Sequence, residues 1–424
     1  MTALLRLAAA SGWNRRGTLS LVALSIALAT LLLLTFERVR LDVRENFSQA
    51  VSSTDLVVGA RTGPVQLMLY AVFRLGGATN NIRVESLAAI AQHRAVAWVV
   101  PLSLGDSHRG FPVLGTTKDY FERFRYGDRQ PLTLAQGSPF GGDLDGLYGV
   151  VLGAEVAQRL HYQLGERLVL AHGSGALPGS EHADKPFTVV GILAPTGTPV
   201  DRTLHISLQA LEAIHLDWSA GVPMKGLAIP AEQARKFDLE PRQVTAALVG
   251  LKGRAAVFAV QRFVNEYEGE PLMAVLPGVA LDELWTVVGV GEKLLLALSG
   301  LVALVSLAGR VATVLAGLNE RRRELAVLRA VGAGPRHVLL LLAAEGLLVT
   351  LAGVLLGVLA SLALIMALGP WLQSSYGVAL SLSAPSASQW QLLAGVLAAG
   401  VLASLVPGLR AYRLSLSDGL APRS

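Results

Sequence analysis

Histidine is concentrated in one part of this chain, which has eight histidines and no cysteine. Imidazole nitrogens and carboxylate oxygens both bind zinc, and the absence of cysteine excludes a thiolate site. Aspartates at positions 184, 201 and 217 lie close to the histidines in the sequence. Zinc binding is therefore one chemistry that this stretch can support. The five clustered histidines are His161, His172, His182, His205 and His215.

The best candidate metal ligands flank a loop rich in glycine, residues 173–186. His172 and His182 stand at its two edges, and Asp184 and His205 are further candidates. A loop of this kind can bring two imidazoles to one ion. The spacing is not a recognised zinc motif, so the alternative is a set of unconnected surface histidines.

Catalytic motifs are missing from the sequence. There is no GxxxxGK[ST] segment, so the chain has no P-loop for ATP. There is also no GxSxG nucleophile elbow. Serine is plentiful, but no set of serine, histidine and aspartate stands out. We therefore predict that the chain is not an enzyme and holds no nucleotide of its own.

The composition indicates a membrane protein. Hydrophobic residues make up 52% of the 424 positions and charged residues 16%, whereas soluble domains carry about 25% charged residues. The mean hydropathy is +0.50. The net charge of +5 does not indicate nucleic-acid binding, because the arginines lie beside apolar runs, where they orient a membrane protein.

Four apolar runs are long enough to cross about 30 Å of hydrocarbon as helices. The first ends in Phe36, Glu37 and Arg38 rather than in the small residues of a cleavage site, so we expect an uncleaved anchor and not a signal peptide. The second run is preceded by a stalk. The runs cover residues 18–37, 284–318 (with the stalk), 338–368 and 390–409.

The placement of arginine predicts the orientation of these spans. Residues 1–17, 319–337 and 410–424 contain arginine, whereas residues 369–389 contain neither lysine nor arginine. By the positive-inside rule, the first three segments are cytoplasmic and residues 369–389 form a short outer loop. Residues 38–283 then form one large domain outside the membrane.

Strand and helix patterns alternate in this outer domain, as is typical of an α+β fold. A helix that starts near Val279 is expected to run into the second span. Strands are expected over residues 96–102, 148–152, 167–171, 187–193, 203–207 and 254–260. Helices are expected over residues 85–93, 153–160 and 208–214.

Some residues inside the apolar runs are unusual for a membrane span. Arg310 either reaches the lipid headgroups or makes a polar contact between helices. Glu345 is a candidate functional residue, with a local salt bridge as the alternative. Gly353 and Gly357 form a GxxxG pattern, which permits close contact between helices.

The segment between the second and third runs reads NERRRELAVLRAVGAGPRHV over residues 319–338. Its leucines and Val331 recur at helical spacing and form a narrow apolar stripe. Gly332, Gly334 and Pro335 then stop the helix. A short helix of this type fits a groove on a soluble partner. A plain basic loop that touches only lipid is the alternative.

The order of the spans and this segment resemble the FtsX-like, or MacB-type, ABC transporter permeases (type VII, the mechanotransmission class). The resemblance covers essentially the whole chain, and residues 320–333 are its most specific part. Looser matches occur at residues 116–124, 149–170 and 186–208. The resemblance implies that the ATPase-coupling residues are Glu320, Arg321, Arg322, Arg323, Glu324, Leu325, Leu328, Arg329 and Gly332.

The resemblance also implies the partners and the function. The chain would be the permease subunit, without a fused ATPase, of a homodimer in the bacterial inner membrane. A separate cytoplasmic ATPase would bind ATP and magnesium and drive motion of the periplasmic domains, which moves or extracts a periplasmic or outer-leaflet substrate. A periplasmic binding or adaptor protein is a further expected partner. The alternatives are a zinc acquisition or delivery system of the same architecture and a scaffold that regulates periplasmic enzymes.

Overall fold

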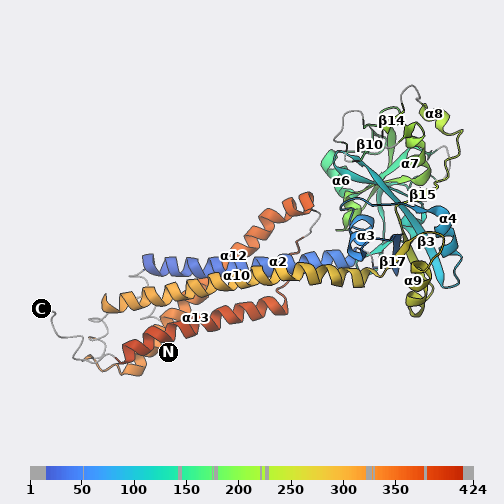
Figure 1. The fold of residues 1–424 in the computed structure, drawn as a ribbon. Coiled ribbons are helices and arrows are strands. Elements are labelled where there is room, and N and C mark those ends of the chain that lie inside the picture. Colours follow the sequence, from blue (N-terminus) through green and yellow to red (C-terminus); the bar gives the residue numbers. More distant parts are fainter. Residues whose placement is uncertain are drawn as a thin grey trace. The chain divides into compact units, whose positions relative to one another are not determined.

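The chain divides into two compact units in the computed structural model. The helical unit comprises residues 1–43, 288–373 and 380–424, and the sheet unit comprises residues 44–287 and 374–379. The helices of the first and the central sheet of the second are drawn in Figure 1. The structure describes residues 16–50, 52–141, 146–173, 175, 180–219, 222–224, 229–320, 327, 330–376 and 380–413.

Four long helices contain the four apolar runs. Each is long and apolar enough to cross a membrane. Each helix also continues beyond its apolar run, because the backbone hydrogen bonds of a helix do not require apolar side chains. The boundaries between the two units, after residues 43 and 287, fall inside the first and second of these helices. The helices are α2 (Arg16–Gln49), α10 (Pro277–Glu320), α12 (Pro335–Tyr376) and α13 (Ala387–Arg413).

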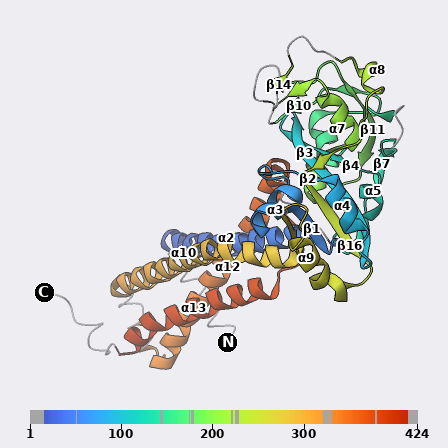
Figure 2. The same ribbon diagram turned by 45° about the vertical axis from the view of Figure 1, so that its right-hand side comes forward.

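Close backbone contact joins α12 to α2 within the helical unit. A Cβ atom at Gly353 would lie 2.8 Å from the carbonyl oxygen of Ala23, and one at Gly357 would lie 2.6 Å from that of Ala27. The GxxxG pattern therefore lies at a helix interface and makes the close contact that its small residues permit. Figure 2 shows α2 and α10 side by side, and the Arg40–Glu292 ion pair of 3.0 Å joins them.

The surface of α10 is uncovered. None of its most apolar 18-residue window is buried against the described part of the chain. Leu294, Leu298 and Leu301 are each more than half exposed. Such a surface requires lipid or another protein chain as its partner.

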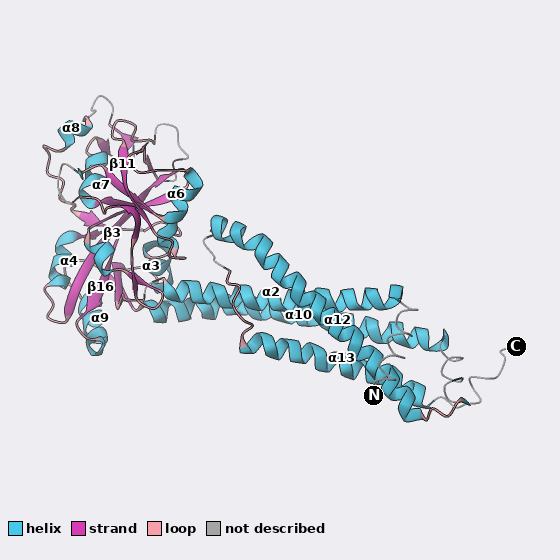
Figure 3. Cartoon of the chain, turned by 180° about the vertical axis from the view of Figure 1, so that it is seen from behind, coloured by secondary structure: helices cyan, strands magenta, loops and turns pink. Residues whose placement is uncertain are grey.

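A mixed sheet forms the centre of the sheet unit, drawn as arrows in Figure 3. Its strands run in the order β17-β1-β16-β3-β4-β12-β8-β11-β7, and β10 and β9 add to β3 and β11. Their bounds are β1 Leu56–Ala60, β3 Val96–His108, β4 Phe111–Thr116, β7 Leu134–Gly137, β8 Gly149–Leu152, β9 Arg167–Leu168, β10 Ala171–His172, β11 Phe187–Leu193, β12 Leu204–Ser207, β16 Ala246–Leu251 and β17 Leu272–Val275.

Smaller elements complete this unit. The short strands pair as β2 with β15, β5 with β6 and β13 with β14; they are β2 Ile82–Arg83, β5 Arg125–Tyr126, β6 Gln130–Pro131, β13 Trp218–Ser219, β14 Val222–Pro223 and β15 Gln243–Val244. The helices are α3 Pro64–Ala71, α4 Val84–Ala91, α5 Asp119–Arg123, α6 Ala154–Leu160, α7 Leu208–His215, α8 Ala231–Ala234 and α9 Val257–Asn265, with 3-10 turns η2 Pro199–Arg202 and η3 Arg254–Ala256.

Strand β3 organises the sheet because its two halves pair with different neighbours. Residues 96–102 pair with β16. Residues 103–108 pair with β4, with a register shift between Leu104 and Ser107. The second half also pairs with β10. Strands β1, β8 and β12 are buried along their whole lengths, as expected of strands covered on both faces.

The expected strand over residues 254–260 is wrong. This segment is η3 followed by the start of α9. Val257, Val260 and Val264 recur at helical spacing, and Val260 and Val264 are buried. Their contact with the core outweighs the preference of β-branched side chains for strands, since tertiary packing overrides intrinsic propensity.

Candidate functional site

One aspartate and three histidines converge in the sheet unit. Asp106, His172, His182 and His215 each offer one candidate ligand atom, and these four atoms lie within 4.8 Å of one another. Four different parts of the fold supply them. Asp106 in β3 lies directly opposite His172 in β10, His182 follows the glycine-rich loop, and His215 is the last residue of α7.

Three of the four candidate ligand atoms are at contact distance. Nδ1 of His172 lies 3.0 Å from Oδ1 of Asp106 and 3.1 Å from Nε2 of His215. The same Asp106 oxygen lies 3.5 Å from Nε2 of His215. The carboxylate is buried, whereas the His172 and His215 side chains are 35% and 27% exposed. The cluster is therefore reached from solvent on its histidine side.

The tautomer of His215 is fixed by its helix. Its Nδ1 lies 2.9 Å from the carbonyl oxygen of Leu211, one turn earlier in α7. A carbonyl oxygen can only accept a hydrogen bond, so Nδ1 carries the proton. In the neutral ring, Nε2 therefore directs a lone pair into the cluster.

His182 is the least satisfied member of the cluster. It is fully buried, and neither of its ring nitrogens has a hydrogen-bond partner among the residues that the structure describes. The Asp106 Oδ2 atom is likewise unpartnered within that part of the chain. The His182 ring lies against the indole of Trp218, with 4.3 Å between ring centroids.

Electrostatics separates the charge states of the cluster. Burial alone would raise the pKa of Asp106, but the polar contacts of its carboxylate with His172 and with the charged form of His215 outweigh burial and lower this pKa to about 2. Burial lowers the pKa of His182 to about 4. Burial also opposes the charged form of His215, yet Asp106 raises the pKa of that residue overall. At neutral pH the cluster thus combines one carboxylate with a neutral, buried imidazole at His182.

Two ligand candidates chosen from the sequence lie elsewhere. The Asp184 carboxylate accepts a hydrogen bond of 2.8 Å from Lys185. His205 is buried in β12, where its ring centroid lies 5.4 Å from that of Tyr120 and 5.8 Å from that of Phe121. Burial in this aromatic core lowers the pKa of His205 to about 3.

Sequence reasoning missed Asp106 as a candidate ligand and did not select His215. Asp106 is far from the histidines along the chain and reaches them only through the pairing of β3 with β10. His215 did belong to the histidine-rich stretch, and its place at the end of an amphipathic helical pattern was a usable signal.

The expected coupling segment is described only at its two ends. Arg321, Arg322, Arg323, Glu324, Leu325, Leu328 and Arg329 lie outside the described residues. Glu320 is the last residue of α10. Gly332 has φ of +101°, a left-handed conformation that glycine adopts readily at the end of a helix. Its place before α12 agrees with the helix stop that the sequence predicted.

The two ionisable residues of the apolar runs lie in different helices. Glu345 in α12 is buried, at 8% exposed. Arg310 belongs to α10. Neither lies in the cluster of ligand atoms described above.

A polar clamp holds residues 380–389 against α2 in the helical unit. The Arg38 guanidinium donates to the carbonyl oxygens of Ser381 (2.6 Å) and Ser383 (2.8 Å). Asp42 lies 3.4 Å from Arg38 and accepts from the Ser381 backbone N–H at 2.9 Å. Arg38 and Asp42 are both buried. The opposite charges of Arg38 and Asp42, together with their backbone hydrogen bonds, thus offset the free-energy cost of burying the two side chains.

Substitution of Arg38 by alanine is expected to release residues 380–389. The change leaves the Asp42 carboxylate buried without its cation, which costs about 3–5 kcal/mol. Hydrogen exchange of the Ser381 and Ser383 backbone amides should become faster in the full chain. Arg40→Ala is the control, because its partly exposed side chain contacts Glu37 and Glu292 instead. Equal exchange in the Arg38 variant and the wild type would contradict the clamp.

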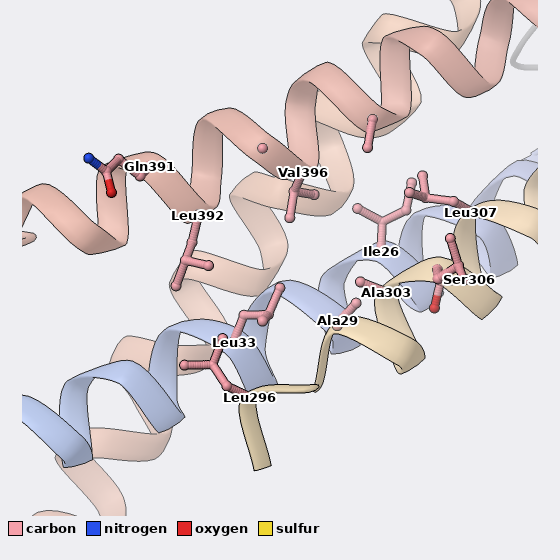
Figure 4. Close-up of a pocket in the computed structure, with 14 residues that line it drawn as sticks. Ile26, Ala29, Leu33, Leu296, Ala303, Ser306, Leu307, Gln391, Leu392 and Val396 are labelled. Atoms are coloured by element: carbon pink, nitrogen blue, oxygen red, sulfur yellow. The ribbon is translucent and has the colours of Figure 1, made fainter. Parts of the chain in front are cut away.

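An apolar cavity of about 350 Å³ lies among α2, α10 and α13. Figure 4 shows Ile26 and Leu33 of α2, Leu296 of α10 and Leu392 of α13 around it. Ser306 contributes one of its few polar groups. The lining is suited to hydrocarbon and offers no set of groups for catalysis.

Comparison with known proteins gives two family matches. The MacB-like periplasmic core domain matches residues 17–266, and the FtsX-like permease C-terminal region matches residues 296–416. No curated protein matches the chain significantly.

Two solved structures resemble part of the chain. The periplasmic region of MacB from Actinobacillus actinomycetemcomitans is 11% identical, with a TM-score of 0.33, over 55% of this chain and 94% of that one. The extracellular domain of the noncanonic ABC-type transporter YknZ from Gram-positive bacteria is 13% identical, with a TM-score of 0.30, over 52% of this chain and 98% of that one.

Proposed function

The chain belongs to the FtsX-like, MacB-type family of ABC transporter permeases, and we propose that it converts ATP hydrolysis by a separate subunit into motion of its periplasmic domain. The observation that carries this proposal is the continuity of α10 from Pro277 to Glu320. This helix begins in the sheet unit and ends where the coupling segment starts. The hydrogen bonds of a helix are internal, so it can transmit a displacement along its length.

The proposed topology has four membrane spans with both termini in the cytoplasm. It is supported by four helices of sufficient length and apolarity and by the placement of arginine. The large domain and residues 369–389 then lie in the periplasm, and residues 319–337 face the cytoplasm. We therefore propose that the chain lies in the inner membrane, which separates the cytoplasm from the periplasm.

In this proposal the partner ATPase binds ATP and magnesium and docks on the coupling segment. The proposed contact residues are those implied by the sequence resemblance, from Glu320 to Gly332. Since Val331 is 84% exposed, part of the apolar stripe is free of contact with the described residues of this chain. This supports an apolar docking helix with arginines at its sides.

We assign the uncovered surface of α10 to a second copy of the chain. Its apolar side chains are exposed along the helix, and a Cβ atom at Gly289 or Gly291 would meet no described atom within 4 Å. These glycines permit either bending of α10 or close approach of the second copy. Disulfide crosslinking of single cysteines at positions 288–295 separates the two, because only close approach gives crosslinked dimers.

Substitution of Leu325 or Leu328 by aspartate tests the coupling. Either change places a charge in the apolar stripe, so stimulation of the partner ATPase by the permease should fall on the order of tenfold. Reconstituted permease and ATPase in lipid give the measurement. Ala330→Asp is the matched control, since Ala330 is exposed and lies on the side of the helix away from the stripe defined by Leu325, Leu328 and Val331. Normal stimulation in both leucine variants would reject this docking site.

The substrate is proposed to be a periplasmic or outer-leaflet molecule that the moving domain extracts or pushes, with a periplasmic binding or adaptor protein as a further partner. The family comparisons support transport and do not favour the two alternatives, a scaffold for periplasmic enzymes and a zinc acquisition system. Copurified hydrolase activity would be the sign of a scaffold.

A further inference from the structure

We propose that Asp106, His172, His182 and His215 together bind one divalent transition-metal ion, of which Zn²⁺ is the best match. This site is separate from the ATPase-coupling segment, and its occupancy does not depend on the proposed coupling function. The inference stands on the positions of the ligand atoms, on the unpartnered buried groups and on the hydrogen bond that orients His215.

The spacing of the ligand atoms fits a single tetrahedral ion. With metal–ligand distances of about 2.0–2.1 Å, tetrahedral geometry separates two ligand atoms by about 3.3 Å. The three pairs formed by Asp106, His172 and His215 are 3.0, 3.1 and 3.5 Å apart. The ligand atom of His182 lies within 4.8 Å of the others, so a small movement of one side chain completes the set.

Unpartnered polar atoms point to a cation at this place. Buried polar side chains nearly always have a partner, and one left without a partner costs about 1–3 kcal/mol. Both ring nitrogens of the fully buried His182 and the Oδ2 atom of Asp106 have no partner among the described residues. An ion would accept a lone pair from one ring nitrogen of His182 and one from the Asp106 carboxylate, and would thereby give each of these buried side chains a partner.

The surroundings resemble the support that metal ligands require. Metal-binding histidines usually donate the second ring N–H to a carboxylate or a backbone carbonyl, which fixes the tautomer. His215 does so to Leu211 at 2.9 Å. Trp218 lies against His182 and at 5.6 Å from His172, between ring centroids, so an apolar wall limits access on one side.

The donor set selects the class of metal. Three imidazoles suit zinc, copper or nickel, whereas magnesium and calcium prefer oxygen ligands. Four protein ligands fill a tetrahedral zinc ion and leave no open position, which is the pattern of structural and not of catalytic zinc. A bound ion would connect β3, β10, the residue after the glycine-rich loop and α7, and so stabilise this end of the sheet unit.

Zinc titration of the full chain in detergent, after chelator treatment, tests the site. We expect one Zn²⁺ per chain and a higher thermal midpoint when zinc is present, because a ligand that binds only the folded state stabilises it. Co²⁺ in place of Zn²⁺ should give the intense visible absorption of a tetrahedral nitrogen and oxygen site. Absence of stoichiometric Zn²⁺ binding would overturn the proposal.

Variants at two ligands then locate the ion. His172→Ala and His215→Ala change partly exposed side chains, so both proteins should fold, and each should bind zinc at least about tenfold more weakly, since even the partners of metal ligands are worth that much. His161→Asn is the control, because His161 is exposed, lies outside the cluster and has φ of +58°, which asparagine tolerates. Unchanged affinity in both ligand variants would place the ion elsewhere and refute the assignment.

Discussion

Substitution of Asp217 by alanine should destabilise the sheet unit far more than substitution of Asp184, although both carboxylates contact the same ammonium group. Lys185 is fully buried, and its Nζ atom lies 2.8 Å from an oxygen of each aspartate. The two carboxylates differ in exposure. The side chain of Asp217 is 6% exposed and that of Asp184 is 44% exposed.

Burial decides the sizes of the two effects. Removal of the buried partner leaves the buried Lys185 ammonium with only the half-exposed Asp184 carboxylate, and loss of a buried ion-pair partner costs about 3–5 kcal/mol. Asp217 also accepts a backbone hydrogen bond of 3.0 Å from Ile229. Burial alone would raise the pKa of Asp217, but Lys185 and this amide hold it below its usual value. Asp184 faces water, and an exposed pair contributes about 0–1 kcal/mol.

Urea unfolding of the full chain in detergent measures this difference. The midpoint should fall strongly for Asp217→Ala and little for Asp184→Ala, with the slope of the transition unchanged. Asp217→Asn should behave like Asp217→Ala, because the amide keeps the shape but removes the charge. Equal losses from the two alanine variants would show that burial of Asp217 does not control the stability of this pair.

Much of the fold could be predicted because the local pattern and the tertiary environment agree. The strand over residues 187–193 has the predicted bounds, since its apolar residues lie between turn-forming segments. Helix α7 follows the predicted pattern, with Ser207 as its N-cap. The valines of α9 fit both a strand pattern and a helix pattern, so the local sequence does not decide between the two. The core contacts of Val260 and Val264 decide in favour of the helix.

The candidate metal site was predictable only in part, for a topological reason. His172 and His182 flank one loop, so their proximity follows from short-range sequence. Asp106 joins them through strand pairing, which is a long-range property with no local signal. His205 shares the histidine-rich stretch but lies on β12, where its ring packs with Tyr120 and Phe121. Nearness in sequence therefore identified half of the cluster and added two residues that have other partners.

Replacement of Gly357 by valine is expected to disrupt the helical unit, because α12 meets α2 at this residue. A Cβ atom there would lie 2.6 Å from the Ala27 carbonyl oxygen and 2.6 Å from the Cβ atom of Thr30. The carbonyl oxygen belongs to the backbone of α2 and cannot rotate away. The helices would have to separate, at a cost of about 1–3 kcal/mol or more for overpacking, with loss of the packing that holds membrane helices together.

Gly395→Val is the matched control for this experiment. Both glycines lie inside helices of the helical unit, so the change in helix propensity is the same. A Cβ atom at Gly395 would meet no described atom within 4 Å, because this residue lines the apolar cavity of about 350 Å³. The thermal midpoint in detergent should therefore fall for the Gly357 variant and hold for the Gly395 variant. Equal thermal midpoints for the two variants would show that contact with α2 does not set the stability effect at Gly357, and the GxxxG pattern of α12 would then have another role.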